Sequence, residues 1–222
     1  MSAAPERREA PAAAAKAPGR VAYRVETARL VLRCYGPEDA PARKAAVDVS
    51  RDHLLPYMSW AKEHPQPVEE HVALLRRFRG MFDLDQERFY GVFDTAEQRV
   101  LGEVGLLMRG GLGARELAYW VRADVAGQGL ATEMAAAATR VGLEVEGLRR
   151  VDIQVDVGNE RSAAVARRLG FHFEGTLRGR QGPRDEHPVD VETFSLLERE
   201  LPSSPAAKVQ LRAFDVLGAR LL

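Results

Sequence analysis

The stretch ELAYWVRADVAGQGLATEM, residues 116–134, decides how the rest of the sequence is interpreted. Side chains alternate in character over residues 116–122, as in a half-buried strand, and residues 130–146 are alanine-rich with apolar side chains at helical spacing. The turn between them contains Gly127 and Gly129. A helix start offers unpaired N–H groups and the positive end of the helix dipole, and glycine lets a phosphate approach the backbone. The turn is therefore either a diphosphate-binding loop or a tight connection without a ligand.

Two familiar phosphate motifs are excluded at this turn. A P-loop needs Lys and then Ser or Thr after its last glycine, whereas Leu130 and Ala131 follow Gly129 here. A dinucleotide-binding fingerprint needs a third glycine where this chain has Thr132, and an acidic residue at the end of the next strand. Asp152 lies inside that strand instead of at its end.

On both sides of this stretch the sequence alternates between strand and helix periods. Residues 151–157 alternate strictly, which predicts a half-buried strand, and Asn159 then caps a helix that ends at Leu169 with Gly170 just beyond. Further strands are expected at 25–34, 88–93, 99–107, 171–177 and 190–197, and further helices at 38–50 and 68–82. This order predicts a mixed α/β domain over residues 21–200.

The charges of the chain balance, with 32 Lys and Arg against 32 Asp and Glu among 222 residues. This balance argues against bulk attraction to nucleic acid or to an anionic membrane. The single cysteine, Cys34, excludes an internal disulfide and a multi-thiolate zinc site, and the five histidines lack the spacing of a metal site. No apolar run approaches the ~18 residues of a membrane span. We therefore expect a soluble, cytoplasmic protein without a metal.

Both ends of the chain differ from the domain in composition. Residues 1–20 are rich in Ala and Pro and contain no aromatic or β-branched residue, which predicts a disordered tail. Residues 201–222 begin as a linker and then carry apolar side chains at roughly helical spacing, namely Leu211, Phe214, Leu217 and Leu221. A C-terminal helix is expected there, either docked on its own domain or contacting another copy.

Six segments, in order along residues 24–200, resemble the GNAT superfamily of acyl-CoA-dependent N-acyltransferases, and within it the RimJ/RimL type that acetylates protein N-termini. They are ETARLVLR (26–33), LLPYMSWA (54–61), VLGEVGLL (100–107), the stretch 116–134, NERSAAVARRLGFHFEGTLR (159–178) and DVETFSLLERE (190–200). The resemblance implies a mostly antiparallel, twisted central sheet flanked by helices. It also implies direct transfer of acetyl from acetyl-CoA to a primary amine in a ternary complex, with the N-terminal α-amine of a protein or peptide as the first expectation.

In that family the turn holds the coenzyme A pyrophosphate through backbone amides. The matching donors are Gly127, Gln128, Gly129, Leu130, Ala131 and Thr132. The family usually has Gln or Arg at the position of Ala126, and this departure predicts weakened cofactor binding. Asn159 matches a residue that bonds the pantetheine arm, although it could be a helix cap alone. Ser162 matches a residue near the cofactor sulfur that could protonate the leaving thiolate, while the tyrosine that many members use is replaced by Ala166.

The attacking amine must be neutral, and the oxyanion that forms must be stabilised. Backbone N–H groups near Val121 could stabilise it. An α-amino group has a pKa of ~7.7–8.0, against ~10.4 for lysine, so one carboxylate acting through a water would suffice as base. Glu103 is ranked first and Glu116 second, and each could instead be a solvated strand residue; Asp185 and Glu186 are further options.

The sequence leaves more than one interpretation open for the acceptor site and for the overall function. Tyr57 and Trp60 either wall the acceptor site or belong to the core. The acceptor could be a small amine such as a polyamine, an aminoglycoside or an amino acid, or the domain could bind acyl-CoA without turnover. No covalent enzyme intermediate is expected, because Cys34 belongs to the first strand. The expected partners are acetyl-CoA and an amine, with no nucleic acid and no membrane, and the chain is expected to be a monomer or homodimer.

Overall fold

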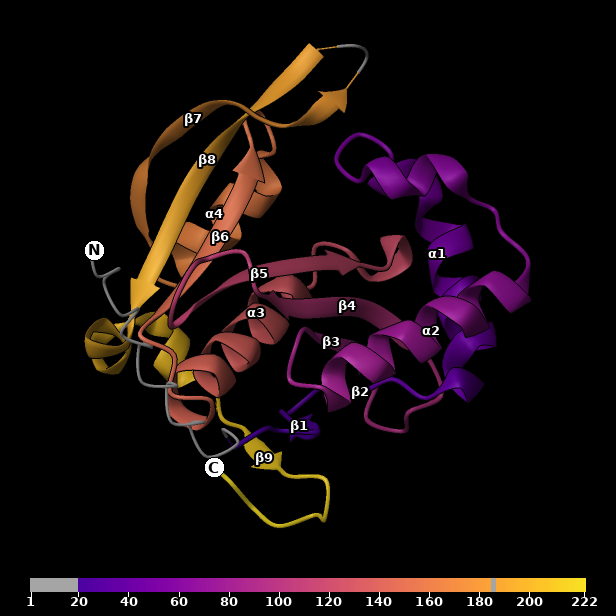
Figure 1. Ribbon diagram of the computed structural model, residues 1–222, viewed down its shortest axis with the longest axis horizontal. Coiled ribbons are helices and arrows are strands. Elements are labelled where there is room, and N and C mark those ends of the chain that lie inside the picture. Colours follow the sequence, from indigo (N-terminus) through magenta and orange to yellow (C-terminus); the bar gives the residue numbers. More distant parts are fainter. Residues whose placement is uncertain (1–19, 185–186) are drawn as a thin grey trace, which may run out of the picture.

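The computed structural model describes residues 20–184 and 187–222. Within these residues, nine strands form one sheet in the order β7-β8-β6-β5-β4-β3-β2-β1-β9 (Figure 1). Its strands are β1 (Arg24–Glu26), β2 (Val31–Cys34), β3 (Arg88–Phe93), β4 (Val100–Leu107), β5 (Ala114–Val121), β6 (Arg150–Asp156), β7 (His172–Arg184), β8 (His187–Leu197) and β9 (Arg212–Phe214). Neighbouring strands are antiparallel, except that β5 and β6 run parallel. The expected mixed α/β fold with a mostly antiparallel sheet is confirmed.

Helices cover both faces of the sheet. They are α1 (Ala40–Leu54), α2 (Val68–Asp83), α3 (Leu130–Arg140), which continues as a π-helical turn (Val141–Val145), and α4 (Glu160–Arg168). The helices α1 and α2 lie on one face beside β3 and β4, and α3 and α4 lie on the other face beside β4, β5 and β6 (Figure 1). Within the described ranges, none of the helices has the length and apolar character that a membrane crossing requires.

Alternation along β5 distributes its side chains between two cores. Leu117 packs in the core under α3 and α4, whereas Trp120 packs in the core under α1 and α2. Helix α2 likewise separates buried from exposed side chains, here at helical spacing: it buries Leu75 and Phe78 and leaves Arg76 and Arg77 exposed. Strict alternation and helical spacing are local signals, which is why the sequence predicts these elements well.

The strands β5 and β6 begin side by side and then separate. Their paired positions are Ala114 with Arg150, Arg115 with Val151 and Glu116 with Asp152. Beyond Glu116, β5 remains paired with β4, and β6 remains paired with β8. Figure 1 shows the two arrows diverging from a common start, so that the C-terminal halves of β5 and β6 are not paired with each other and the sheet divides into two limbs.

Two sequence expectations near the chain ends differ from the structure. The single strand expected at 25–34 is split into β1 and β2, because Thr27 Oγ1 accepts a hydrogen bond from the Leu30 amide (3.0 Å) and turns the chain. The helix expected within 206–222 is absent from this fully described segment. Short 3₁₀ turns (Glu198–Ser203 and Pro205–Lys208) are followed by β9, which pairs with the edge strand β1.

The physical reason lies in the sheet edge: without residues 212–214, β1 would present an unpaired edge, and these residues add a strand to it instead of forming a helix. Leu201 and Ala206 are buried, so this part packs on the domain, whereas Leu217 is exposed. The tail predicted for residues 1–20 falls, apart from Arg20, outside the described residues, as do Asp185 and Glu186.

Candidate active site

The separation of β5 from β6 leaves one backbone edge of β5 without a strand partner in the described chain. The last residues of β5 are paired with β4 on one side, up to Val121 opposite Gly102, and they have left β6 on the other. Backbone N–H and C=O groups of a strand point alternately to both sides. This edge can therefore hydrogen-bond an extended ligand that enters between the limbs, and Val121 is the last residue of β5.

The glycine turn directly follows this edge. Gly127 (φ +82°) and Gly129 (φ +79°) both adopt the left-handed conformation that favours glycine. None of the amides of residues 127–132 has a hydrogen-bond partner among the described residues, whereas the Glu133 amide donates to Gly129 O (3.1 Å) and begins the helical pattern. A Cβ added at Gly127 would meet nothing within 4 Å. Unpaired amides around open space at a helix N-terminus form a cradle for an anion such as a diphosphate.

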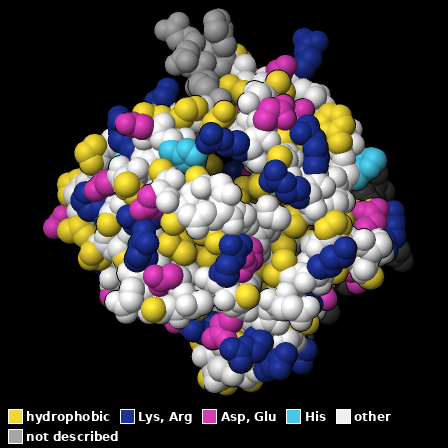
Figure 2. Space-filling model, turned by 180° about the vertical axis from the view of Figure 1, so that it is seen from behind, with side chains coloured by type: hydrophobic (Ala, Val, Ile, Leu, Met, Phe, Trp, Pro, Cys, Tyr) yellow, Lys and Arg dark blue, Asp and Glu magenta, His cyan; other side chains and the backbone are white. Residues whose placement is uncertain are grey.

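The helix α1 supports this turn from the other side. Ser50 Oγ accepts a hydrogen bond from the Ala123 amide (3.0 Å) in the 3₁₀ turn (Ala123–Val125) that precedes the glycines. Burial, together with the positive charge of Arg161 on α4, lowers the pKa of His53 near the end of α1. Figure 2 shows a hollow near the middle of the rear face with Lys or Arg side chains and a His around it. Positive charge at such a rim favours the approach of an anion.

Ser162 and Tyr119 meet where α4 crosses β5. Tyr119 Oη lies 2.9 Å from Ser162 Oγ and 3.2 Å from the Ser162 carbonyl oxygen. Asn159 caps α4, because its Oδ1 accepts a hydrogen bond from the Ser162 amide (3.3 Å). Burial raises the pKa of Tyr119 to about 12, against the opposing effect of the hydrogen bond with Ser162, so the hydroxyl stays protonated near neutral pH.

Sequence reasoning missed Tyr119 as a functional residue. Its alternation with Leu117 and Val121 predicts only that it faces the same side of the sheet as they do. The contact with Ser162 depends on how α4 crosses β5, and no local pattern reports that crossing. Ala166, which stands where many family members have a tyrosine, is fully buried in the core.

Glu103 lies on the other face of the sheet, opposite Trp120 in the β4–β5 ladder. Its side chain is buried and accepts a hydrogen bond from Arg43 Nε of α1 (2.9 Å). Arg43 NH1 in turn lies 3.1 Å from His71 Nδ1. A buried carboxylate with an arginine partner is strongly held as an ion pair, and removing one partner leaves an uncompensated charge. The alternative of a solvated strand residue is excluded for Glu103.

Glu116 shares this face and lies where β5 and β6 begin to separate. It is paired across the sheet with Asp152 of β6, and its ion pair with Arg109 is longer, at 3.4 Å. Burial raises the pKa of Glu116, although the charge and hydrogen bond of Arg109 act in the opposite direction. A carboxyl whose pKa is raised towards neutrality is better suited to accept a proton than one of ordinary pKa.

The two aromatic candidates occupy different environments. Trp60, in the 3₁₀ turn (Ser59–Glu63) after α1, packs against Trp120 with ring centroids 6.2 Å apart and against His64 at 5.5 Å. Tyr57 is 37% exposed. Trp60 is therefore joined to the end of β5 through Trp120, on the face that carries both glutamates, whereas Tyr57 lies at the surface nearby.

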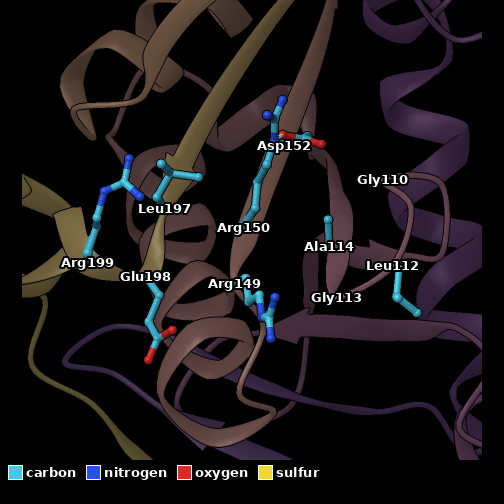
Figure 3. Close-up of a pocket in the computed structure, with 10 residues that line it drawn as sticks. All are labelled: Gly110, Leu112, Gly113, Ala114, Arg149, Arg150, Asp152, Leu197, Glu198 and Arg199. Carbon is cyan, nitrogen blue, oxygen red and sulfur yellow. Dashed lines mark hydrogen bonds and ion pairs between the residues drawn. The ribbon is translucent and has the colours of Figure 1, made fainter.

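Other candidate chemistries find no support in the structure. Cys34 is buried in β2, and burial raises the pKa of its thiol to about 12. No group of three or more metal-ligating side chains occurs in the part of the chain that the structure describes. A pocket of about 620 Å³ lies at the opposite end of β5 and β6, where Figure 3 shows Arg149, Arg150 and Asp152 around it. None of the predicted site residues lines that pocket.

The comparisons with known proteins agree with this geometry. The family described as "Acetyltransferase (GNAT) domain" matches residues 29–172, which is more than half of the chain. The chain belongs to the GNAT acetyltransferases. Among curated proteins, the "Putative ribosomal N-acetyltransferase YdaF" of Bacillus subtilis is 36% identical over 85 residues, which are 38% of this chain and 46% of YdaF. That match spans less than half the length of YdaF.

Solved GNAT structures share the fold at low identity. RimJ of Mycobacterium smegmatis, solved in complex with CoA-disulfide, superposes with a TM-score of 0.73 at 23% identity, covering 83% of this chain and 91% of that chain. RimL, the ribosomal L7/L12 alpha-N-protein acetyltransferase in complex with coenzyme A, superposes with a TM-score of 0.70 at 21% identity, covering 77% of this chain and 95% of that chain. Both likenesses concern the fold.

Proposed function

We propose that this GNAT acetyltransferase transfers the acetyl group of acetyl-CoA to the α-amino group of a protein or peptide N-terminus, by direct attack in a ternary complex. One observation carries the proposal: β5 parts from β6 after Glu116, its free end leads into the unpaired amides of residues 127–132, and its Tyr119 contacts the Ser162 hydroxyl of α4. The RimL structure is described as that of an alpha-N-protein acetyltransferase with coenzyme A, and YdaF carries a ribosomal assignment, which supports the choice of acceptor.

The donor site fits acetyl-CoA, which supplies an acetyl group activated as a thioester. The amides of residues 127–132 would hold its diphosphate, because they are unpaired and the two glycines leave room for an anion. The free edge of β5 up to Val121 would bind the extended arm, and Asn159 would contact the arm while it caps α4.

We assign protonation of the leaving sulfur to one face of β5 and approach of the amine to the other face. Ser162 and Tyr119 are on the α4 face, where the Ser162 hydroxyl donates to the leaving sulfur and Tyr119 holds that hydroxyl in place. The carboxylates and Trp120 are on the α1–α2 face, from which the amine approaches. Tyr57 and Trp60 would form the acceptor wall on this face, and amides near Val121 would stabilise the developing oxyanion.

The choice of base is argued from the environments of the two glutamates. Glu103 is held by Arg43 in a buried ion pair, so a proton on Glu103 would break that pair. Glu116 has the longer ion pair and the raised pKa. Glu116 and Tyr119 are three positions apart along β5, about 10 Å, so a chain of waters must relay the proton. We therefore place Glu116 first as base, reversing the order in which the sequence ranks them.

This assignment predicts a pH dependence. A base must be deprotonated, so activity is lost as pH falls through the pKa of Glu116, and burial places that loss above the ordinary value of 4.5. Glu116→Gln should lower kcat by about a hundredfold and flatten the acidic limb of kcat/KM. The measurement is a pH–rate profile of both proteins. An unchanged limb in the variant would remove Glu116 from the mechanism.

The acceptor is tested by coenzyme A release with matched amines. Three kinds of acceptor are compared. They are a peptide with a free N-terminus, the same peptide with a blocked N-terminus and an internal lysine, and a set of polyamines, aminoglycosides and amino acids. We expect turnover with the free peptide and none with the blocked one, because the α-amine has a pKa of ~7.7–8.0 and needs little deprotonation. Turnover with small amines alone would overturn the proposed acceptor. Binding of acetyl-CoA without turnover of any amine would leave a non-catalytic module.

A further inference from the structure

Arg29 joins the turn between β1 and β2 to the glycine turn at the start of α3. Its Nε donates to Glu133 Oε2 (2.6 Å), and its NH1 donates to the Gln128 carbonyl oxygen (2.9 Å). Glu133 also accepts a hydrogen bond from Thr27 Oγ1 (2.6 Å). Arg29 therefore contacts both a side chain of α3 and the backbone of the loop that would hold the diphosphate.

The contact with Gln128 fixes the direction of a neighbouring amide. In a planar trans peptide, the carbonyl and the following N–H point in opposite directions. Because Arg29 holds the Gln128 carbonyl, the Gly129 N–H is directed to the opposite side of that peptide. Gly129 adopts φ +79°, a left-handed conformation that glycine reaches without steric cost. Arg29 thus orients one of the unpaired amides of the cradle.

The contact with Glu133 compensates a negative charge beside the unpaired amides. Glu133 lies in the first turn of α3 and is only 12% exposed, so its negative charge would oppose an anion bound to the nearby amides. The guanidinium of Arg29 compensates that charge and remains 49% exposed. Its NH2 would be 3.7 Å from a Cβ added at Gly129, which places positive charge beside the loop. Ala126, where the family usually has Gln or Arg, supplies none.

We propose that Arg29 is a positioning residue for the donor diphosphate, which makes up for Ala126 by orienting the Gly129 amide and neutralising Glu133. The proposal deepens the proposed function at the donor site and rests on the assignment of residues 127–132 to the diphosphate. It is independent of the identity of the acceptor.

The test is a calorimetric titration of coenzyme A into wild type, Arg29→Met, Glu133→Gln and the double variant. We expect Arg29→Met to raise Kd about tenfold, the size of a lost charge interaction of ~1.4 kcal/mol. Adding Glu133→Gln to Arg29→Met should recover part of the affinity and leave Kd about threefold above wild type, because the uncompensated charge is gone while the Gly129 amide is still not held in place. A merely structural link would show no such restoration, since the second substitution only removes the remaining partner.

A matched control separates this effect from general loss of surface charge. Arg99 is also 49% exposed and pairs with Asp124 just before the glycine turn, so Arg99→Met should leave Kd within about twofold of wild type. Arg29→Met with wild-type Kd, or a double variant as weak as Arg29→Met, would overturn the proposal. Wild type that binds no coenzyme A would instead overturn the donor-site assignment and with it the proposed function.

Discussion

Gly127→Ala is expected to weaken coenzyme A binding by at least about a hundredfold. The Cβ would enter the open space in front of the unpaired amides of residues 127–132, and φ +82° would strain an alanine so that the loop shifts. Loss of two hydrogen bonds to a charged phosphate, at ~1.5–3 kcal/mol each, is enough for this effect. The measurement is a thermal melt with ligand, in which wild type with coenzyme A at ~100 times Kd gains ~2.7 kcal/mol.

Gly147→Ala is the matched control for this variant. Gly147 is also left-handed (φ +67°), and a Cβ there would also meet nothing within 4 Å, but it lies in the turn before β6. Both variants should lose a similar ~1–2 kcal/mol of stability without ligand. Only Gly127→Ala should lose the rise in midpoint of roughly 5–10 °C that the ligand gives wild type. A full ligand shift in Gly127→Ala would show that the diphosphate binds elsewhere.

The fold was predictable wherever the signal is local. The alternation of residues 151–157 corresponds to β6, and the helical spacing of 68–82 corresponds to α2, because each pattern is set by which side chains face a core. The C-terminal segment was not predictable in this way. Leu211, Phe214 and Leu217 suit a helix, yet residues 212–214 pair with β1, and the partner that makes this possible is far away in the sequence.

In the candidate site, too, features set by neighbouring residues are predictable from the sequence, and contacts between distant segments are not. The glycine turn is a contiguous stretch between a strand and a helix, so its position follows from the sequence, and the structure adds that both glycines are left-handed. The contacts of Tyr119 with Ser162, of Glu103 with Arg43 and of Arg29 with Glu133 each join distant segments. The sequence ranks Glu103 above Glu116, and only their partners in the structure, Arg43 and Arg109, give a reason to reverse that order.

Tyr119→Phe is expected to lower kcat by about a hundredfold while the KM for acetyl-CoA stays within about threefold of wild type. The substitution keeps the ring and removes the oxygen that lies 2.9 Å from Ser162 Oγ. Ser162 then loses the partner that orients its hydroxyl towards the leaving sulfur, whereas the amides that hold the diphosphate are untouched. Ser162→Ala should have an effect of similar size for the same reason.

The double variant shows whether the two hydroxyls act as one unit. If they do, Tyr119→Phe with Ser162→Ala should be no slower than the slower single variant, whereas independent contributions would multiply. Tyr23→Phe is the matched control, because Tyr23 Oη also makes a hydrogen bond (2.9 Å, to Asp83) and burial also raises its pKa to about 12, but it lies in the segment preceding β1. Wild-type kcat in Tyr119→Phe would contradict the assignment.

The effect of Tyr119→Phe should not depend on pH in the neutral range. Because the pKa of Tyr119 is about 12, its hydroxyl is protonated throughout that range. Loss of the hydroxyl should therefore lower kcat equally at every neutral pH, while the acidic limb that we assign to Glu116 persists.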